Sequence, residues 1–176
     1  ILKYLRWYFP WGKITGFFVD KNYDVFVMDY RTYGKSTGEL SEQALYKDAQ
    51  MCYDYVTKNY KESEITIYGR SLGTGLATYL ASINKPNRLI LETPYYSLTD
   101  VAKLRFSLFP TNKLLRYDFP SYKFIQKATC PITIFHGTND AVVPYTSGEK
   151  LFNCMSQKEK SFFTIENGAH NNLIEF

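Results

Sequence analysis

The stretch ITIYGRSLGTG, residues 65–75, decides the fold of this chain. Its first four residues are β-branched or aromatic, which favours a short buried strand. Residues 69–73 have the pattern G-x-S-x-G, and residues 76–83 are predicted to continue as a helix. A strand that runs through this pattern into a helix places Ser71 at a sharp, strained turn. The glycines on either side of Ser71 leave room for the strand and the helix to approach each other.

Two nucleotide-binding patterns do not fit the glycines of this chain. Residues 73–75 are followed by Thr78 where a dinucleotide-binding fingerprint requires glycine. Residues 34–36 resemble the end of a phosphate-binding loop, but Asp29 stands where such a loop begins with glycine. We therefore interpret the turn at Ser71 as a nucleophile elbow, in which the Leu72 amide faces an oxyanion that forms beside the serine hydroxyl.

The bulk composition predicts one globular domain. At 176 residues and 45% hydrophobic content, the chain can bury one sizeable core. A net charge of +4 without a long Lys/Arg run argues against nucleic acid as the main partner. No apolar run approaches the length of a membrane span, and no signal peptide is recognisable. Because the first residue is Ile1, we expect the natural N-terminus to lie upstream, which leaves an anchor and membrane association open.

The three cysteines, Cys52, Cys130 and Cys154, are odd in number and widely spaced, with no C-x-x-C pair. This spacing matches neither a disulfide framework nor a zinc site. We interpret them as small buried hydrophobic residues of a reducing compartment, which favours the cytoplasm.

Predicted strands and helices alternate along the chain. Strands are expected at residues 23–28, 65–68, 88–91, 132–135 and 162–165, and helices at residues 11–21, 42–59, 76–83 and 147–154. Ser41 is the expected N-cap of the second helix, whose inward face should comprise Leu45, Ala49, Cys52, Tyr55 and Val56. The alternation predicts an α/β fold, a mostly parallel sheet with helices on both faces.

Residues 97–127 have a different pattern, in which apolar and basic side chains alternate. Pro110 and Pro120 break this segment into short helical pieces. We interpret it as a small cap over the strand ends, within one domain that spans residues 1–176, and we expect Phe106 or Phe109 to line a pocket near Ser71. The alternative is an ordinary crossover helix with a solvated basic face.

A serine hydroxyl needs an adjacent base, and the chain has only two histidines. His170 follows the last predicted strand, where its side chain can swing over the sheet edge toward the elbow. His136 ends its own strand, where a ring is more often packed or bonded to backbone. Asp140 is the expected acid partner of the base, with Glu92 as the alternative acid and an Asx turn as the alternative role of Asp140.

Four motifs together resemble the α/β-hydrolase superfamily, and within it the lysophospholipase-like and serine aminopeptidase-like branch, which includes depalmitoylase-like proteins. They are DYRTYGKS at residues 29–36, GRSLG at 69–73, HGTND at 136–140 and GAH at 168–170. The resemblance implies a serine hydrolase with Ser71 as nucleophile, Asp140 as acid and His170 as base. It implies a small-molecule acyl substrate and neither a metal nor an organic cofactor, and it leaves the oligomeric state open.

The chain departs from this family pattern in three places. Thr32 stands where the family usually has glycine. No His-Gly loop, which supplies the second oxyanion amide in the family, occurs between Ile1 and Trp11. The chain also holds about three strands fewer than family members, so we expect an N-terminally incomplete fold with a break or a poorly formed strand near residues 1–9.

Two functions follow from these observations. The leading one is hydrolysis of a carboxylic ester, thioester or amide through an acyl-enzyme. The alternative is a non-catalytic hydrolase-fold binding protein, or an inactive fragment that lacks a complete oxyanion hole.

Overall fold

The computed structural model describes residues 11–105 and 115–176 of the chain. In this part of the chain, four strands form one parallel sheet in the order β1-β2-β3-β4. The strands are β1 (Thr66–Arg70), β2 (Arg88–Glu92), β3 (Ile132–Gly137) and β4 (Lys160–Ile165). The expected α/β architecture is confirmed, and each strand lies next to the strand that follows it in the sequence.

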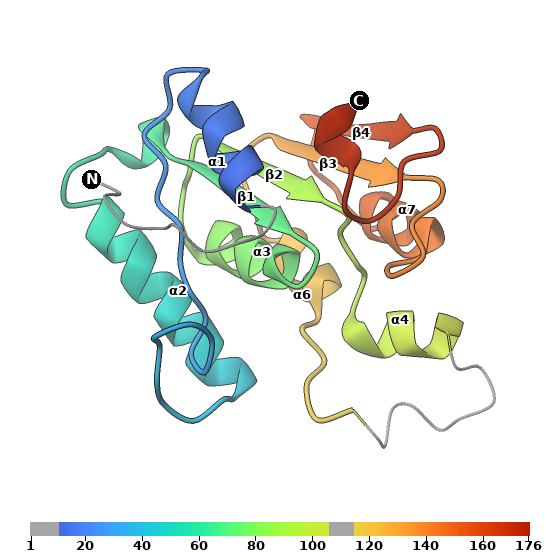
Figure 1. Cartoon of the computed structure of the whole chain (residues 1–176), viewed down its shortest axis with the longest axis horizontal. Helices are drawn as coiled ribbons and strands as arrows, with labels where there is room; N and C mark the ends of the chain where they lie inside the picture. Colours follow the sequence, from blue (N-terminus) through green and yellow to red (C-terminus); the bar gives the residue numbers. More distant parts are fainter. Residues whose placement is uncertain (1–10, 106–114) are drawn as a thin grey trace.

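Helices cover both faces of the sheet (Figure 1). One face carries α1 (Trp11–Val19) and the C-terminal turn η2 (Leu173–Glu175). An ion pair between Lys13 of α1 and Glu175 of η2, at 3.1 Å, connects these two elements. The opposite face carries α2 (Glu42–Val56), α3 (Gly73–Ile83), α6 (Ser121–Ile125) and α7 (Tyr145–Asn153). The described residues also contain the short turn η1 (Glu62–Glu64) and α4 (Leu98–Arg105).

The core lies between the sheet and the helices of its second face. Leu91 of β2 and Ile134 of β3 are paired neighbours, and both are completely buried. Ile125 of α6 and Leu151 of α7 pack into the same cluster and are equally buried. Burial of each such side chain contributes about 1.5–3 kcal/mol, so these contacts hold the strand ends in fixed positions.

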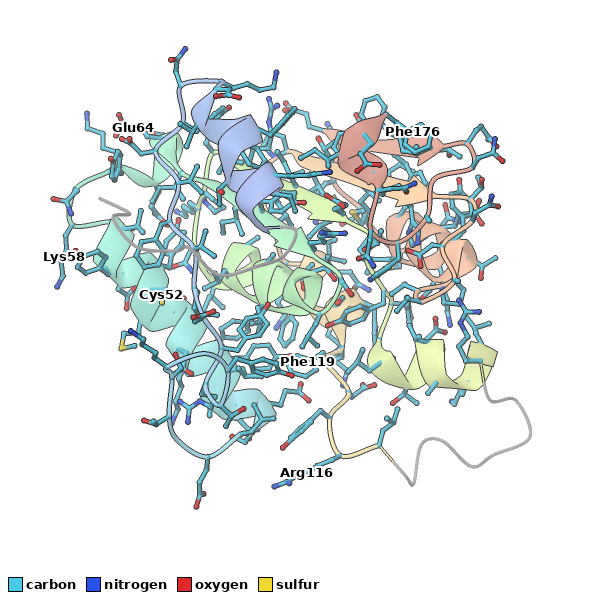
Figure 2. The ribbon with its side chains drawn as sticks, in the orientation of Figure 1. Cys52, Lys58, Glu64, Arg116, Phe119 and Phe176 are labelled. Atoms are coloured by element: carbon cyan, nitrogen blue, oxygen red, sulfur yellow. The ribbon has the colours of Figure 1, made fainter. Side chains whose placement is uncertain are left out.

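A second cluster of aromatic side chains lies where α2, α3 and α6 meet. The Tyr46 ring stacks on the Tyr79 ring with centroids 4.4 Å apart, and it meets the edge of the Phe119 ring at 5.7 Å. Phe119 lies beside the lower end of α2 in Figure 2 and is buried. These rings fix α2 on α3, and Ser41 caps α2 as expected, because its hydroxyl accepts the Ala44 amide at 3.1 Å.

The expectation of a strand at Tyr23–Met28 was wrong. This segment is not paired with any described strand, although its residues favour a pleated surface. A β-strand is stabilised by the ladder with its neighbour, and side-chain preference alone does not supply one. The segment is held instead by side chains: the rings of Tyr23 and Phe18 lie 5.9 Å apart, as do those of Phe26 and Tyr55.

The inward face expected for α2 needs one correction. Leu45 and Ala49 are buried as expected, together with Tyr46 and Tyr53. Tyr55, which was expected to face the core, is 57% exposed. The buried stripe of α2 therefore runs through Tyr53, four residues after Ala49, which is the spacing of one helical face.

The segment 97–127 contains α4 and α6, and its two parts lie in different places. α6 packs against α3, whereas α4 follows the carboxyl end of β2 and lies on the side of α7 (Figure 1). Phe106 and Phe109 lie outside the described residues, as do residues 1–9, near which a break or a poorly formed strand was expected. The cap therefore stays a prediction.

Within residues 11–105 and 115–176, no helix combines the length and the apolar character that crossing a membrane requires.

Candidate active site

Ser71 lies at the sharp turn between β1 and α3. Its φ angle is +49°, a strained value for a residue with a side chain. The Ser71 amide donates to the carbonyl oxygen of Glu92 at the end of β2, at 3.0 Å. A Cβ atom on Gly69 would lie 2.6 Å from the Cβ of Ala77, so only glycine lets β1 and α3 approach this closely. The expected strand–turn–helix geometry is therefore present.

The structure brings Ser71, His170 and Asp140 together. Nε2 of His170 lies 2.9 Å from the Ser71 hydroxyl oxygen, and Nδ1 lies 2.8 Å from Oδ2 of Asp140. Both His170 and Asp140 are buried. Because Nδ1 faces a carboxylate, it carries the ring proton, and Nε2 is left to accept the proton of the serine. The three side chains thus form one continuous hydrogen-bonded chain.

Asp140 is held in its ionised form by several donors. Its Oδ1 accepts the amides of Val142 and Val143, both at 2.8 Å. Burial by itself would raise the pKa of Asp140, but the hydrogen bonds from His136, His170 and these two amides hold that pKa well below its ordinary value. The buried carboxylate is therefore charged at neutral pH. The bond from the Val142 amide to the Asp140 side chain, two residues earlier, is also that of an Asx turn, which was the alternative role of Asp140.

His136 has a different environment from His170. It is completely buried, and its Nε2 lies 3.1 Å from the Val143 carbonyl oxygen and 3.5 Å from Oδ2 of Asp140. Nε2 must therefore carry the proton, and Nδ1 has no hydrogen-bond partner among the described residues. A Cβ atom on Gly148 would come within 2.2 Å of that Nδ1, so α7 packs directly on the ring. His136 supports the turn of Asp140 and does not face Ser71.

Glu92, the alternative acid, is occupied elsewhere. Its carboxylate pairs with Arg70 at 3.1 Å and accepts the Tyr68 hydroxyl. Arg70 also donates to the backbone carbonyl of His170. We did not single out Arg70 from the sequence. The sequence did contain a signal for it: Arg70 is a charged residue at the end of a strand that must be buried on both faces, and a buried charge requires a partner.

The Leu72 amide lies at the N-terminal end of α3, directly after Ser71. In the part of the chain that the structure describes, this amide donates to no other group. The Ser71 carbonyl, which shares a peptide unit with this amide, accepts the Thr74 amide at 2.9 Å and the Thr74 hydroxyl at 2.6 Å, which fixes the orientation of the peptide. A free amide at a helix N-terminus is suited to an anionic oxygen beside Ser71.

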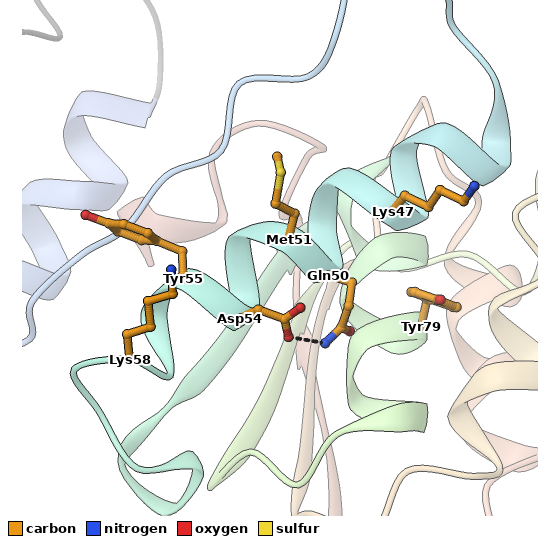
Figure 3. A pocket seen from close by; sticks show the side chains of 7 residues that line it. All are labelled: Lys47, Gln50, Met51, Asp54, Tyr55, Lys58 and Tyr79. Atoms are coloured by element: carbon orange, nitrogen blue, oxygen red, sulfur yellow. Dashed lines mark hydrogen bonds between the residues drawn. The ribbon is translucent and has the colours of Figure 1, made fainter.

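A surface hollow of about 440 Å³ lies elsewhere, on the outer side of α2 (Figure 3). It is lined by Lys47, Gln50, Met51, Asp54, Tyr55, Lys58 and Tyr79. None of the three residues of the hydrogen-bonded chain is among them, so this hollow is separate from Ser71. Within the described ranges, no group of three His, Cys, Asp or Glu side chains is placed to hold a metal ion, and all three cysteines are free thiols.

Sequence comparison places these features in a known family. The chain matches the serine aminopeptidase family S33 over residues 11–124 and 121–176. It is 36% identical over 171 residues to the uncharacterized protein R595 of Acanthamoeba polyphaga mimivirus, with 84% of this chain and 58% of that protein covered. It is 31% identical over 155 residues to the lysophosphatidylserine lipase ABHD12 of Danio rerio, with 78% of this chain and 41% of that protein covered.

Solved structures have the same fold at low sequence identity. The monoacylglycerol lipase of Paleococcus ferrophilus superposes with a TM-score of 0.68 and 16% identity, over 92% of this chain and 80% of that one. The esterase Pf2001 of Pyrococcus furiosus gives a TM-score of 0.72 at 17% identity, over 89% of this chain and 65% of that one. The chain spans about half the length of the curated relatives it matches, between 41% and 58% for those of the mimivirus and Danio rerio. By its sequence and its fold, the chain belongs to the serine aminopeptidase S33 family of the α/β-hydrolase superfamily.

Proposed function

We propose that the protein is a serine hydrolase that cleaves a carboxylic ester through an acyl-enzyme. The observation that carries this proposal is the position of His170, whose two ring nitrogens lie 2.9 Å from the Ser71 hydroxyl and 2.8 Å from the Asp140 carboxylate. A serine hydroxyl is a weak nucleophile, and an imidazole oriented by a buried carboxylate is the group that activates it.

The first step forms the acyl-enzyme. Oγ of Ser71 bonds to the substrate carbonyl carbon while its proton passes to Nε2 of His170. The carbonyl oxygen becomes an oxyanion, which the Leu72 amide stabilises, and Asp140 stabilises the imidazolium. The imidazolium then gives its proton to the leaving alcohol as the carbon–oxygen bond breaks.

The second step releases the acid. Water gives a proton to Nε2 of His170 and its oxygen bonds to the acyl carbon, which restores an oxyanion beside the Leu72 amide. Collapse of this intermediate breaks the bond to Oγ, and Ser71 takes back the proton from the imidazolium.

An ester is the favoured substrate because proteins similar to this chain include a lysophosphatidylserine lipase, a monoacylglycerol lipase and an esterase. A thioester or an amide reacts through the same steps with a thiol or an amine as the leaving group. The apolar side chains of residues 97–127 favour an acyl chain as the part of the substrate that is bound.

A fluorophosphonate probe tests the proposal, because it reacts with a serine only when a base activates the hydroxyl. We expect the protein to be labelled at Ser71, and Ser71→Ala to abolish labelling without loss of the fold. Hydrolysis of a short-chain p-nitrophenyl ester should disappear in the same variant. A folded protein that is neither labelled nor active would overturn the proposal in favour of a non-catalytic binding protein.

A further inference from the structure

Arg70 ends β1 directly before Ser71, and only 6% of its side chain is exposed. Its Nε lies 3.1 Å from Oε1 of Glu92, the residue paired with it at the end of β2. A terminal nitrogen of the same guanidinium donates to the carbonyl oxygen of His170 at 3.1 Å and to Oδ1 of Asn171 at 2.9 Å. One buried cation thus joins the ends of two strands to the loop that carries His170.

This loop needs an anchor because it must cross the sheet. β4 lies at one edge of the described sheet and β1 at the other, with β2 and β3 between them. The beginning of the loop is held beside β3, where the Asn139 amide donates to the Gly168 carbonyl at 2.9 Å. At the far end of the crossing, Arg70 holds the backbone of His170 and the side chain of Asn171.

The guanidinium is itself fixed in place. The second oxygen of the Glu92 carboxylate accepts the Tyr68 hydroxyl, so both carboxylate oxygens are engaged. Burial and the nearby Glu92 raise the pKa of Tyr68, which keeps its hydroxyl a donor. The planar fork of Arg70 can satisfy Glu92 and the loop at the same time, which a lysine cannot do.

We propose that Arg70 is a positioning residue for His170: its guanidinium fixes the backbone of residues 170–171 so that the imidazole bridges Asp140 and Ser71. The inference rests on the proposed function, in which His170 is the base. A purely structural ion pair between Arg70 and Glu92 would instead stabilise the fold and leave the orientation of the ring unchanged.

Three variants separate these roles. Arg70→Gln removes all the contacts, Arg70→Lys keeps the charge but loses the fork, and Asn171→Ala removes one loop contact while the pair with Glu92 stays intact. We expect kcat for a p-nitrophenyl ester to fall about 10- to 100-fold in both Arg70 variants at an unchanged KM. Asn171→Ala should lower kcat by about 10-fold or less, with little change in the melting temperature because the side chain is exposed.

Arg31→Gln is the matched control. Arg31 forms a half-buried pair with Asp48, with nitrogen–oxygen distances of 2.7 and 2.8 Å, and its guanidinium also donates to the Glu39 carbonyl and not to the loop of His170. Its loss should lower the melting temperature and leave kcat unchanged. If kcat fell in proportion to the melting temperature in Arg31→Gln, Arg70→Gln and Arg70→Lys alike, Arg70 would have a structural role only.

A ¹⁵N NMR spectrum of the histidine rings tests the orientation of His170 without a measurement of turnover. The chain has two histidines, so the ¹⁵N signals of the His170 ring can be assigned by comparison with His170→Ala. We expect the His170 signals to shift in Arg70→Lys and Asn171→Ala, and the His136 signals to stay in place. Unchanged His170 signals in both variants would overturn the proposal, whereas a shift in a protein that cannot be labelled would overturn only the proposed function.

Discussion

Gly137 and Gly168 touch through their backbones: a Cβ atom on Gly137 would lie 2.1 Å from the carbonyl oxygen of Gly168. Gly137 ends β3 shortly before Asp140, and Gly168 follows β4 shortly before His170. This contact lets the two loops approach until the carboxylate and the imidazole are 2.8 Å apart. The close approach of the Asp140 carboxylate and the His170 imidazole thus depends on two residues that have no side chain.

Gly137→Ala is expected to disrupt the site and the fold together. The added methyl group would meet backbone atoms that cannot move away, so the loops must separate. We expect the free energy of unfolding in urea to fall by about 1–3 kcal/mol and fluorophosphonate labelling to slow by about 100-fold. Gly16→Ala is the control, because nothing lies within 4 Å of a Cβ atom there. This helical position should gain up to about 1 kcal/mol. Full labelling of Gly137→Ala would contradict the prediction.

Thr32→Gly should stabilise the protein. Thr32 stands in the loop position where glycine was expected, and it adopts a φ angle of +70°. A β-branched residue in this region is strained by about 1–3 kcal/mol, and the larger entropy of glycine in the unfolded chain offsets about 0.4–1 kcal/mol of that gain. We expect a net increase of about 1 kcal/mol in the free energy of unfolding. Asn22→Gly, at φ +63°, should gain less, because asparagine tolerates this conformation. An equal or smaller gain at Thr32 would show the strain argument to be wrong.

The charge on Asp140 predicts a pH dependence of stability. Its pKa in the folded protein lies below the ordinary value, because hydrogen bonds from two histidines and two amides outweigh burial. The carboxylate therefore stabilises the folded state above about pH 4, its unfolded pKa, and this contribution is lost as the pH falls further. Asp140→Asn does not titrate, so the stability advantage of the wild type over this variant should shrink in acid. Urea unfolding of both proteins at several pH values between neutral and acidic measures this difference in stability. A difference that grew as the pH fell would contradict the prediction.

The two histidines should differ sharply in their effect on labelling. His170→Ala removes the ring whose Nε2 lies 2.9 Å from the Ser71 hydroxyl oxygen, and we expect labelling to slow by about 1,000-fold or more. His136→Gln keeps a donor near the Val143 carbonyl, so labelling should remain within about 10-fold of the wild type. Both rates should be measured on variants that are folded by circular dichroism. A larger loss in His136→Gln than in His170→Ala would reverse the assignment.

The cap predicted at residues 97–127 has its own test. If Phe106 and Phe109 line the acyl site, replacing both with alanine should lower kcat/KM for long-chain p-nitrophenyl esters more than for short-chain ones, because buried apolar contact is lost. Phe17→Ala is the control, since this 43% exposed ring belongs to α1. An unchanged preference for chain length would leave no role for the cap in binding the acyl group.

Local chemistry was sufficient to predict much of this protein. Short apolar runs became β1, β2 and β3, because a strand buried on both faces must be apolar throughout. Glycines around Ser71 predicted the elbow, because a strand and a helix cannot otherwise meet at such a turn. The alternation of elements placed Ser71, Asp140 and His170 after strand ends, and parallel strands present those ends at one edge of the sheet.

The sequence did not predict equally well which distant segments pack or pair with one another. Tyr23–Met28 has the composition of a strand, yet it is not paired with any described strand. Which residues of α2 face inward was also misjudged at Tyr55, because the core partners of a helix are set by what packs against it. Both errors concern a choice of neighbour, which composition does not encode.

The sequence by itself determined that Ser71 sits on an elbow and that a histidine and a carboxylate follow later strands. The sequence favoured His170 over His136 as the base, but only the tertiary structure decided the distances that join His170 to Ser71 and Asp140, and that Arg70 reaches a loop 100 residues further along the chain. The physical reason is that these contacts depend on the order and register of the strands. In the sheet β1-β2-β3-β4, that order sets how far the loop after β4 must travel and which buried side chain meets it.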